Sequence, residues 1–113
     1  MLFLVDTDID FNALGQQRDE VLTAEWAHVE QQWQNGTMLR IWRKANGLGI
    51  IGVWDVADAD ALRAEITSLP IFRYLSDIRV TPLVQHPKYP HHARPESGQV
   101  TEFKTNGNTV APA

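Results

Sequence analysis

Apolar residues near the start of the chain alternate partly with polar ones and predict a β-strand over Leu2–Ile9. Residues 10–16 are expected to form a loop. A helix is predicted next, over about residues 17–34, because four large apolar residues recur there at helical spacing. They are Leu22, Trp26, Val29 and Trp33. We expect this stripe to face the core.

Two further apolar runs, at residues 38–44 and 48–56, flank Asn46-Gly47 and predict a β-hairpin. The Asn-Gly pair favours a two-residue type I′ turn, because both central positions of that turn need a positive φ angle. A second helix is expected to begin after Asp58, whose side chain suits the N-cap position, and to run to about residue 68.

The last predicted element is a strand over residues 77–84. Pro82 lies inside it and indicates an edge position, because proline cannot donate to a ladder. Beyond residue 88 the chain is polar and contains Pro, Gly, Asn and His. We therefore expect residues 1–88 to form one domain and residues 89–113 to form an extended tail.

The predicted order is strand, helix, strand, strand, helix, strand, which is the pattern of a ferredoxin-like α+β fold with an antiparallel sheet. The helices of this fold cover one face of the sheet. We expect the other face to carry apolar residues that no element covers: Ile41, Ile51, Val53 and Val80, or the residues that alternate with them. Such a face favours pairing with a second copy, so that two sheets close into a dimeric α+β barrel.

The net charge and the composition of the chain exclude several kinds of partner and of functional site. The 113-residue chain has a net charge of −4 at pH 7, so it lacks the excess of Lys and Arg that a nucleic-acid surface needs. It contains no cysteine, which excludes disulfides, thiolate metal ligands and a cysteine nucleophile. The apolar run at residues 1–5 is too short for a signal peptide or a membrane span. We expect a cytoplasmic protein that binds neither nucleic acid nor membrane.

Several short stretches, in this order, resemble the muconolactone Δ-isomerases. The chain opens with MLFLV and continues with NGTMLRIWR, VWDVADADAL, LPIFRYL and IRVTPLVQHP. The resemblance covers residues 1 to about 88. It implies a ferredoxin-like chain that dimerises through its sheet and often assembles into a decamer. It also implies a small-molecule substrate, an unsaturated lactone from catechol catabolism, in which a double bond is moved by proton transfer without a metal or an organic cofactor.

The sequence departs from the family pattern at three places. The family places a Lys and a Glu one turn apart on the first helix; Glu25 stands at the Glu position, but the Lys position is Leu22. Arg40 replaces a His on the second strand. A polar run on the third strand becomes Leu48-Gly49-Ile50-Ile51. The pocket is therefore expected to be more apolar than that of the family.

Three residues are candidates for the chemistry. Glu25, half-buried beside the apolar stripe, would have a raised pKa and act as a proton carrier; the alternative is a boundary residue paired with Arg18. His28 lies one turn further and is a general base, half of a metal site, or a solvated side chain. Tyr74 is either a hydrogen-bond donor to the substrate or a structural residue.

Other residues are candidates for substrate binding. Arg40 and Arg43 lie on opposite faces of their strand; either would bind a substrate carboxylate, or would form an ion pair across the dimer. Several aromatic side chains are assigned either to a ligand cavity or to the core and interfaces. These are Trp26, Trp33, Trp42 and Trp54, with His86 at a substrate or subunit contact. No metal site is predicted; His86, His91 and His92 with Tyr89 favour a solvated arm.

The leading hypothesis is a cofactor-free isomerase in which Glu25 carries the proton, helped by His28 or Tyr74. Another enzyme activity on the same barrel, a cyclase or a cofactor-free oxygenase acting on a larger apolar substrate, is the first alternative. A non-catalytic ligand-binding module is the second.

Overall fold

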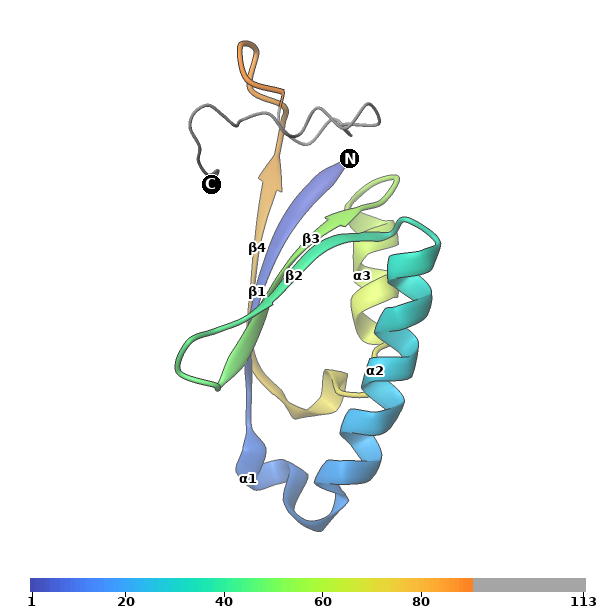
Figure 1. The fold of residues 1–113 in the computed structure, drawn as a ribbon, viewed down its shortest axis with the longest axis vertical. Helices are drawn as coiled ribbons and strands as arrows, with labels where there is room; N and C mark the ends of the chain where they lie inside the picture. Colours follow the sequence, from blue (N-terminus) through green and yellow to red (C-terminus); the bar gives the residue numbers. More distant parts are fainter. Residues whose placement is uncertain (91–113) are drawn as a thin grey trace, which may run out of the picture.

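The structure is a computed structural model, and it describes residues 1–90 (Figure 1). The chain forms four strands and three α-helices, with short 3-10 helices at Gly15–Gln17 and Phe72–Tyr74. In order, the elements are β1 (Leu2–Ile9), α1 (Phe11–Leu14), α2 (Arg18–Gln34), β2 (Met38–Arg43), β3 (Gly49–Asp55), α3 (Ala59–Thr67) and β4 (Leu75–Leu83). Apart from α1, this is the predicted order of strands and helices.

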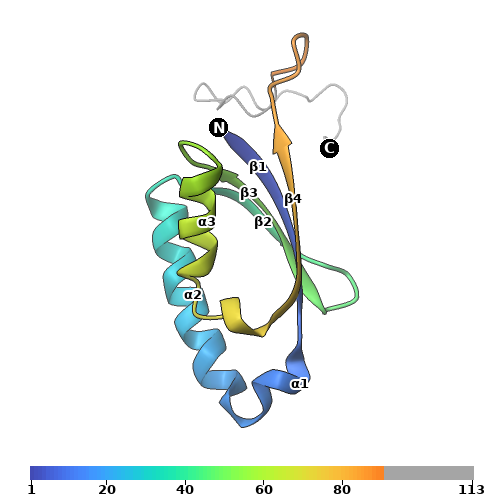
Figure 2. The ribbon, with the colours of Figure 1, turned by 180° about the vertical axis from the view of Figure 1, so that it is seen from behind.

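The strands form one antiparallel sheet in the order β2-β3-β1-β4, and α2 and α3 lie against the same face of it (Figure 2). This is the predicted ferredoxin-like α+β fold. β4 is an edge strand, as Pro82 indicated. Asp58 caps α3, because its carboxylate accepts a hydrogen bond from the Ala61 backbone amide at 2.8 Å. Gly36, which follows α2, has a φ of 84°, the left-handed conformation typical of a helix end.

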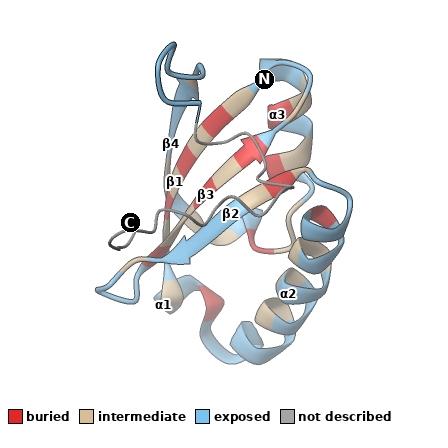
Figure 3. Ribbon diagram, turned by 45° about the horizontal axis from the view of Figure 1, so that its top comes forward, coloured by how far each residue is buried: buried red, intermediate tan, exposed pale blue. Residues whose placement is uncertain are grey.

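The core lies between α3 and the middle of the sheet (Figure 3). Six buried residues form it, and each is at most 6% exposed: Phe3, Val5, Met38, Trp54, Leu62 and Ile66. Because side chains alternate along a strand, Phe3, Val5 and Trp54 point to the helix-covered face, which we call the inner face. The opposite face, without helices, is the outer face.

Two local predictions were wrong. Residues 10–16 were expected to be a loop, but Asp10 accepts a hydrogen bond from the Ala13 amide and so caps the short helix α1. The β2–β3 hairpin was expected to have a two-residue turn. Lys44 instead pairs with Gly49 through its backbone amide at 2.8 Å, which leaves a four-residue loop at 45–48 in which Gly47 has a φ of 77°.

The assignment of apolar residues to the outer face was half right. Ile51 and Val53 lie on it, as predicted. Ile41 and Val80 do not: Ile41 pairs with Gly52, and Val80 pairs with Val5, in the same row of the inner face. The side chains of each strand alternate between the two faces, as predicted. Only the pairing register of the strands shows which of the two alternating sets of side chains faces the helices.

Charged residues occupy one end of the outer face. Lys44, which follows β2, reaches across to Asp6 at 2.5 Å and to Asp8 at 2.6 Å on β1. Arg79 on β4 contacts the same two carboxylates at 3.0 and 3.3 Å. Hydrogen bonds from the Lys44 ammonium group are the main cause that lowers the pKa of Asp6 and of Asp8. These bonds join three strands across the sheet.

Among residues 1–90, no helix is both long and apolar enough to cross a lipid bilayer.

Candidate active site

A cavity of about 940 Å³ lies between α2 and the inner face of the sheet. The apolar stripe of α2 was predicted to face the core. It lines this cavity instead. Trp26 is 60% exposed and Trp33 is 48% exposed, while Leu22 and Val29 are only partly buried. The space between this helix and the sheet is therefore large enough to hold a ligand.

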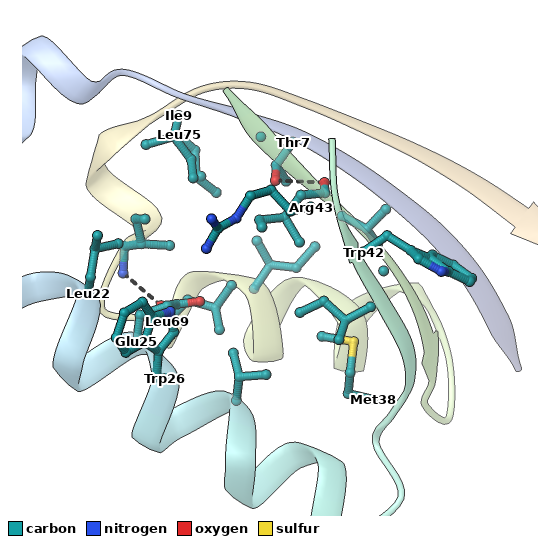
Figure 4. A pocket seen from close by; sticks show the side chains of 18 of the residues that line it. Thr7, Ile9, Leu22, Glu25, Trp26, Met38, Trp42, Arg43, Leu69 and Leu75 are labelled. Carbon is teal, nitrogen blue, oxygen red and sulfur yellow. Dashed lines mark hydrogen bonds between the residues drawn. The ribbon is translucent and has the colours of Figure 1, made fainter. Parts of the chain in front are cut away.

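Glu25 projects from α2 into this cavity (Figure 4). Its carboxylate accepts a hydrogen bond from the Ile71 backbone amide at 3.1 Å, and it forms no ion pair with Arg18 or any other described residue. Burial raises the pKa of Glu25 above its ordinary value of 4.5, and the Ile71 hydrogen bond opposes this increase in part. The Ile71 amide holds one carboxylate oxygen and so fixes the orientation of the group. Because its pKa is raised, the carboxylate also binds a proton more readily than an exposed glutamate does.

Arg43 also points into the cavity, from the edge strand β2 (Figure 4). It forms no ion pair or hydrogen bond with the rest of the described chain, so its guanidinium group is free to hold an anion. Arg40 and Trp42 lie on the outer face, and Arg40 donates to the Leu39 carbonyl at 2.8 Å. Trp42 is one of the residues that border the cavity, although its indole points away from the cavity in Figure 4. The structure therefore brings Arg43, and not Arg40, together with Glu25.

The other candidates are distributed unevenly around the cavity. Trp26 and Trp54 line it. His28 lies outside it, where its Nε2 is 3.3 Å from the Ser68 hydroxyl. The Tyr74 hydroxyl donates to Gln17 at 2.8 Å, away from the lining. His86 follows β4, and its Nδ1 accepts hydrogen bonds from the amides of Lys88 and Tyr89.

Sequence reasoning missed two groups of the site. Thr7 is 8% exposed, lies on the cavity wall and donates to the Ile50 carbonyl at 3.1 Å. Its alternation with Phe3 and Val5 along β1 was a signal that it faces inward. The Ile71 amide that binds Glu25 is a main-chain group, and no residue type predicts it.

Within residues 1–90, no three carboxylate or imidazole side chains gather into a group that could hold a metal ion. The expected solvated arm includes His91 and His92, which lie outside the described residues, as does most of the predicted tail.

Fold and cavity together define a ferredoxin-like α+β protein with a ligand-sized site between its helices and its sheet. A family model described as muconolactone delta-isomerase matches residues 1–89. The muconolactone Delta-isomerase of Pseudomonas aeruginosa is 31% identical over 93 residues, which cover 80% of this chain and 96% of the relative. The chain therefore belongs to the muconolactone delta-isomerase family, and it is an enzyme of the isomerase class.

Solved structures agree with this assignment. A crystal structure of muconolactone isomerase matches with a TM-score of 0.69 and 28% identity, covering 77% of this chain and 92% of that one. A 5-chloro-2-hydroxyhydroquinone dehydrochlorinase from Burkholderia phenoliruptrix matches with a TM-score of 0.64 and 14% identity, covering 78% and 98%. The second match shows the shared fold alone.

The burial of Glu25 leads to a prediction for stability. Because the pKa of Glu25 is raised above 4.5 in the folded chain, the folded chain holds this proton more tightly than the unfolded chain. The contribution of Glu25 to the free energy of unfolding therefore falls as the pH rises through the pKa that this group has in the folded chain. Glu25→Gln, which keeps an acceptor for Ile71, should match the wild type at about pH 4 and be more stable than it at about pH 7.

Urea unfolding of both proteins between about pH 4 and 8 measures this difference. Asp6 and Asp8 are present in both, so the effect of their lowered pKa values cancels. Glu20→Gln, on the exposed side of the same helix, is the control and should show no such trend. A difference that stays constant with pH would contradict the prediction.

Proposed function

We propose that this isomerase moves a double bond within a small unsaturated lactone that carries a carboxylate, by proton transfer at Glu25. The observation that carries this proposal is a half-buried carboxylate with a raised pKa beside an unpaired guanidinium group in one apolar cavity. A raised carboxyl pKa lies closer to neutral pH, where a group that must both take and return a proton is most effective.

The chemistry needs one proton carrier. In its ionised form Glu25 takes a proton from the carbon γ to the lactone carbonyl. The electron pair of that C–H bond moves through the double bond and leaves negative charge on the carbonyl oxygen. Glu25 then returns the proton to the α carbon, the charge leaves the oxygen, and the double bond lies one position along the ring. The Ile71 amide holds one carboxylate oxygen, which leaves the other to face the ligand.

Arg43 is proposed to bind the substrate carboxylate. Its position at the rim of the cavity places a cation beside an otherwise apolar wall, where an ion pair is screened less than in water. Such binding would hold the γ carbon near Glu25. The family match favours isomerisation over the cyclase, oxygenase and ligand-binding alternatives.

Replacing the proton carrier should abolish most turnover. Glu25→Gln is expected to lower kcat with muconolactone by about 100- to 10,000-fold, the usual contribution of a positioned general acid–base, with little change in KM. The ultraviolet change as the double bond moves measures the rate. Glu20→Gln is the matched control and should retain activity. Full activity in Glu25→Gln would exclude the proposed role.

Replacing the two arginines should separate their roles. Arg43→Gln is expected to weaken binding by about 10- to 100-fold, because it removes a hydrogen bond between charged groups. Arg40→Gln, on the outer face of the same strand, should leave KM unchanged. Steady-state KM values of the two variants give the comparison, and equal effects would contradict the assignment to Arg43.

We also propose that the enzyme is a homo-oligomer that pairs through its outer sheet face. No described element covers this face, and it carries Leu4, Ile51 and Val53 beside the exposed Trp42. Apolar residues on a helix-free face favour burial against a second copy. In that arrangement the cavities would lie on the far sides of the paired sheets.

A single charge should disrupt this pairing. Ile51→Arg places a cation in the middle of the outer face, next to Asp6, which can pair with it in a monomer. The wild type is expected to sediment as a multiple of the chain mass, and Ile51→Arg as a smaller species. Leu48→Arg, at an exposed hairpin position, is the control. A monomeric wild type would refute the proposal.

A further inference from the structure

The indole N–H of Trp54 is a buried donor that no part of the described chain satisfies. Trp54 is 3% exposed and packs in the core with Phe3 and Leu62, yet it also lines the cavity. The nitrogen donates no hydrogen bond to any other residue among 1–90. An N–H group in such a poorly hydrated position gains more than a fully exposed one when a ligand supplies an acceptor.

This nitrogen is not sealed from solvent. Among the described residues, the one side-chain polar atom that is both sealed and without a partner is Oε1 of Gln32. The Trp54 nitrogen therefore keeps some access, and because Trp54 lies on the inner face, that access is from the cavity. The indole N–H is thus available to a bound molecule.

Gly52 fixes the position of the nitrogen. A Cβ atom at Gly52 would lie 2.9 Å from the Trp54 nitrogen and 3.0 Å from the Met38 sulfur. The indole edge therefore lies against the bare backbone of Gly52, and the Met38 sulfur lies against the same glycine. Only glycine leaves room for this arrangement, because any side chain would displace the indole.

The Trp54 indole and Arg43 share the inner face of the sheet. Gly52, against which the indole lies, pairs with Ile41, and Arg43 lies two residues further along β2. These two backbone rows are roughly 7 Å apart. A ligand whose anionic group binds Arg43 would extend along the inner face toward the Trp54 nitrogen.

We propose that Trp54 donates this hydrogen bond to the carbonyl oxygen of the bound lactone and stabilises the negative charge that forms there. The inference rests on the proposed function, in which removal of the γ proton sends an electron pair to that oxygen. A donor already in place strengthens its hydrogen bond as the charge develops. Trp54 would thus complete a site in which Arg43 holds the carboxylate and Glu25 carries the proton.

Ligand binding tests the contact without turnover. The protein is labelled with ¹⁵N in its tryptophan side chains, and the Trp54 indole resonance is assigned by its loss in Trp54→Phe, or by elimination from the three other Trp→Phe variants if that one does not fold. Muconolactone should shift this resonance downfield. Cyclopentenylacetic acid, which keeps the carboxylate and the ring but lacks the carbonyl, should not. Equal shifts with both ligands, or none with either, would overturn the proposal.

Turnover provides the second measurement. Trp54→Phe keeps an aromatic ring in the core but removes the donor, and it is expected to lower kcat by about 100-fold or more, as loss of an oxyanion donor does. A Trp54→Phe variant that is folded and fully active would refute the role of the N–H group.

The two proposals can fail separately. A selective indole shift in a protein that does not turn over muconolactone would keep the Trp54 contact and exclude the proposed reaction. Turnover that depends on Glu25, with an indole resonance that does not move, would keep the reaction and exclude the contact. If muconolactone does not bind to the wild type at all, both proposals are wrong.

Discussion

The site depends on the packing of α3, and not of α2, against the sheet. Leu62 and Ile66 of α3 are buried against Phe3 and Trp54, which closes one half of the inner face. α2 is joined to α3 instead: Gln32, its one buried residue, donates to Glu65 of α3 at 2.9 Å. The other half of the inner face borders the cavity. The cavity is thus a consequence of which helix carries the core contacts.

The surroundings of Glu25 in this cavity explain why the pKa of its carboxyl group is raised. Burial, the main cause, raises the pKa of its carboxyl group. A lysine one turn away would lower that pKa, because a nearby cation favours the ionised form. Leu22 occupies this position, so the carboxylate is neutralised by no side chain of its own helix. Leucine at this position thus leaves the proposed proton carrier in place but changes its electrostatic surroundings, and our proposal assigns the binding of the anionic group to Arg43.

Much of the fold could be predicted from the sequence, but the site only in part. The order of the long elements follows from local signals such as Asp58 at a helix start, and these signals do not depend on tertiary packing. Alternation correctly separated Arg40 from Arg43, yet it could not show which one faces the cavity, because that depends on strand register. The apolar stripe of α2 was assigned to the core because a cavity wall and a core surface need the same residue types. The Ile71 amide has no sequence signal at all.

The four tryptophans show why burial and face matter more than residue type. Trp42 lies on the outer face, Trp26 and Trp33 form an exposed rim, and Trp54 is enclosed. Water can satisfy the indole N–H at the exposed positions, so a ligand there gains little by replacing it. At Trp54 the same group is held in a low-dielectric wall, where a hydrogen bond to a charged oxygen is stronger. In our proposal, the charge that forms on the lactone carbonyl is therefore stabilised more by this enclosed N–H than by an exposed indole.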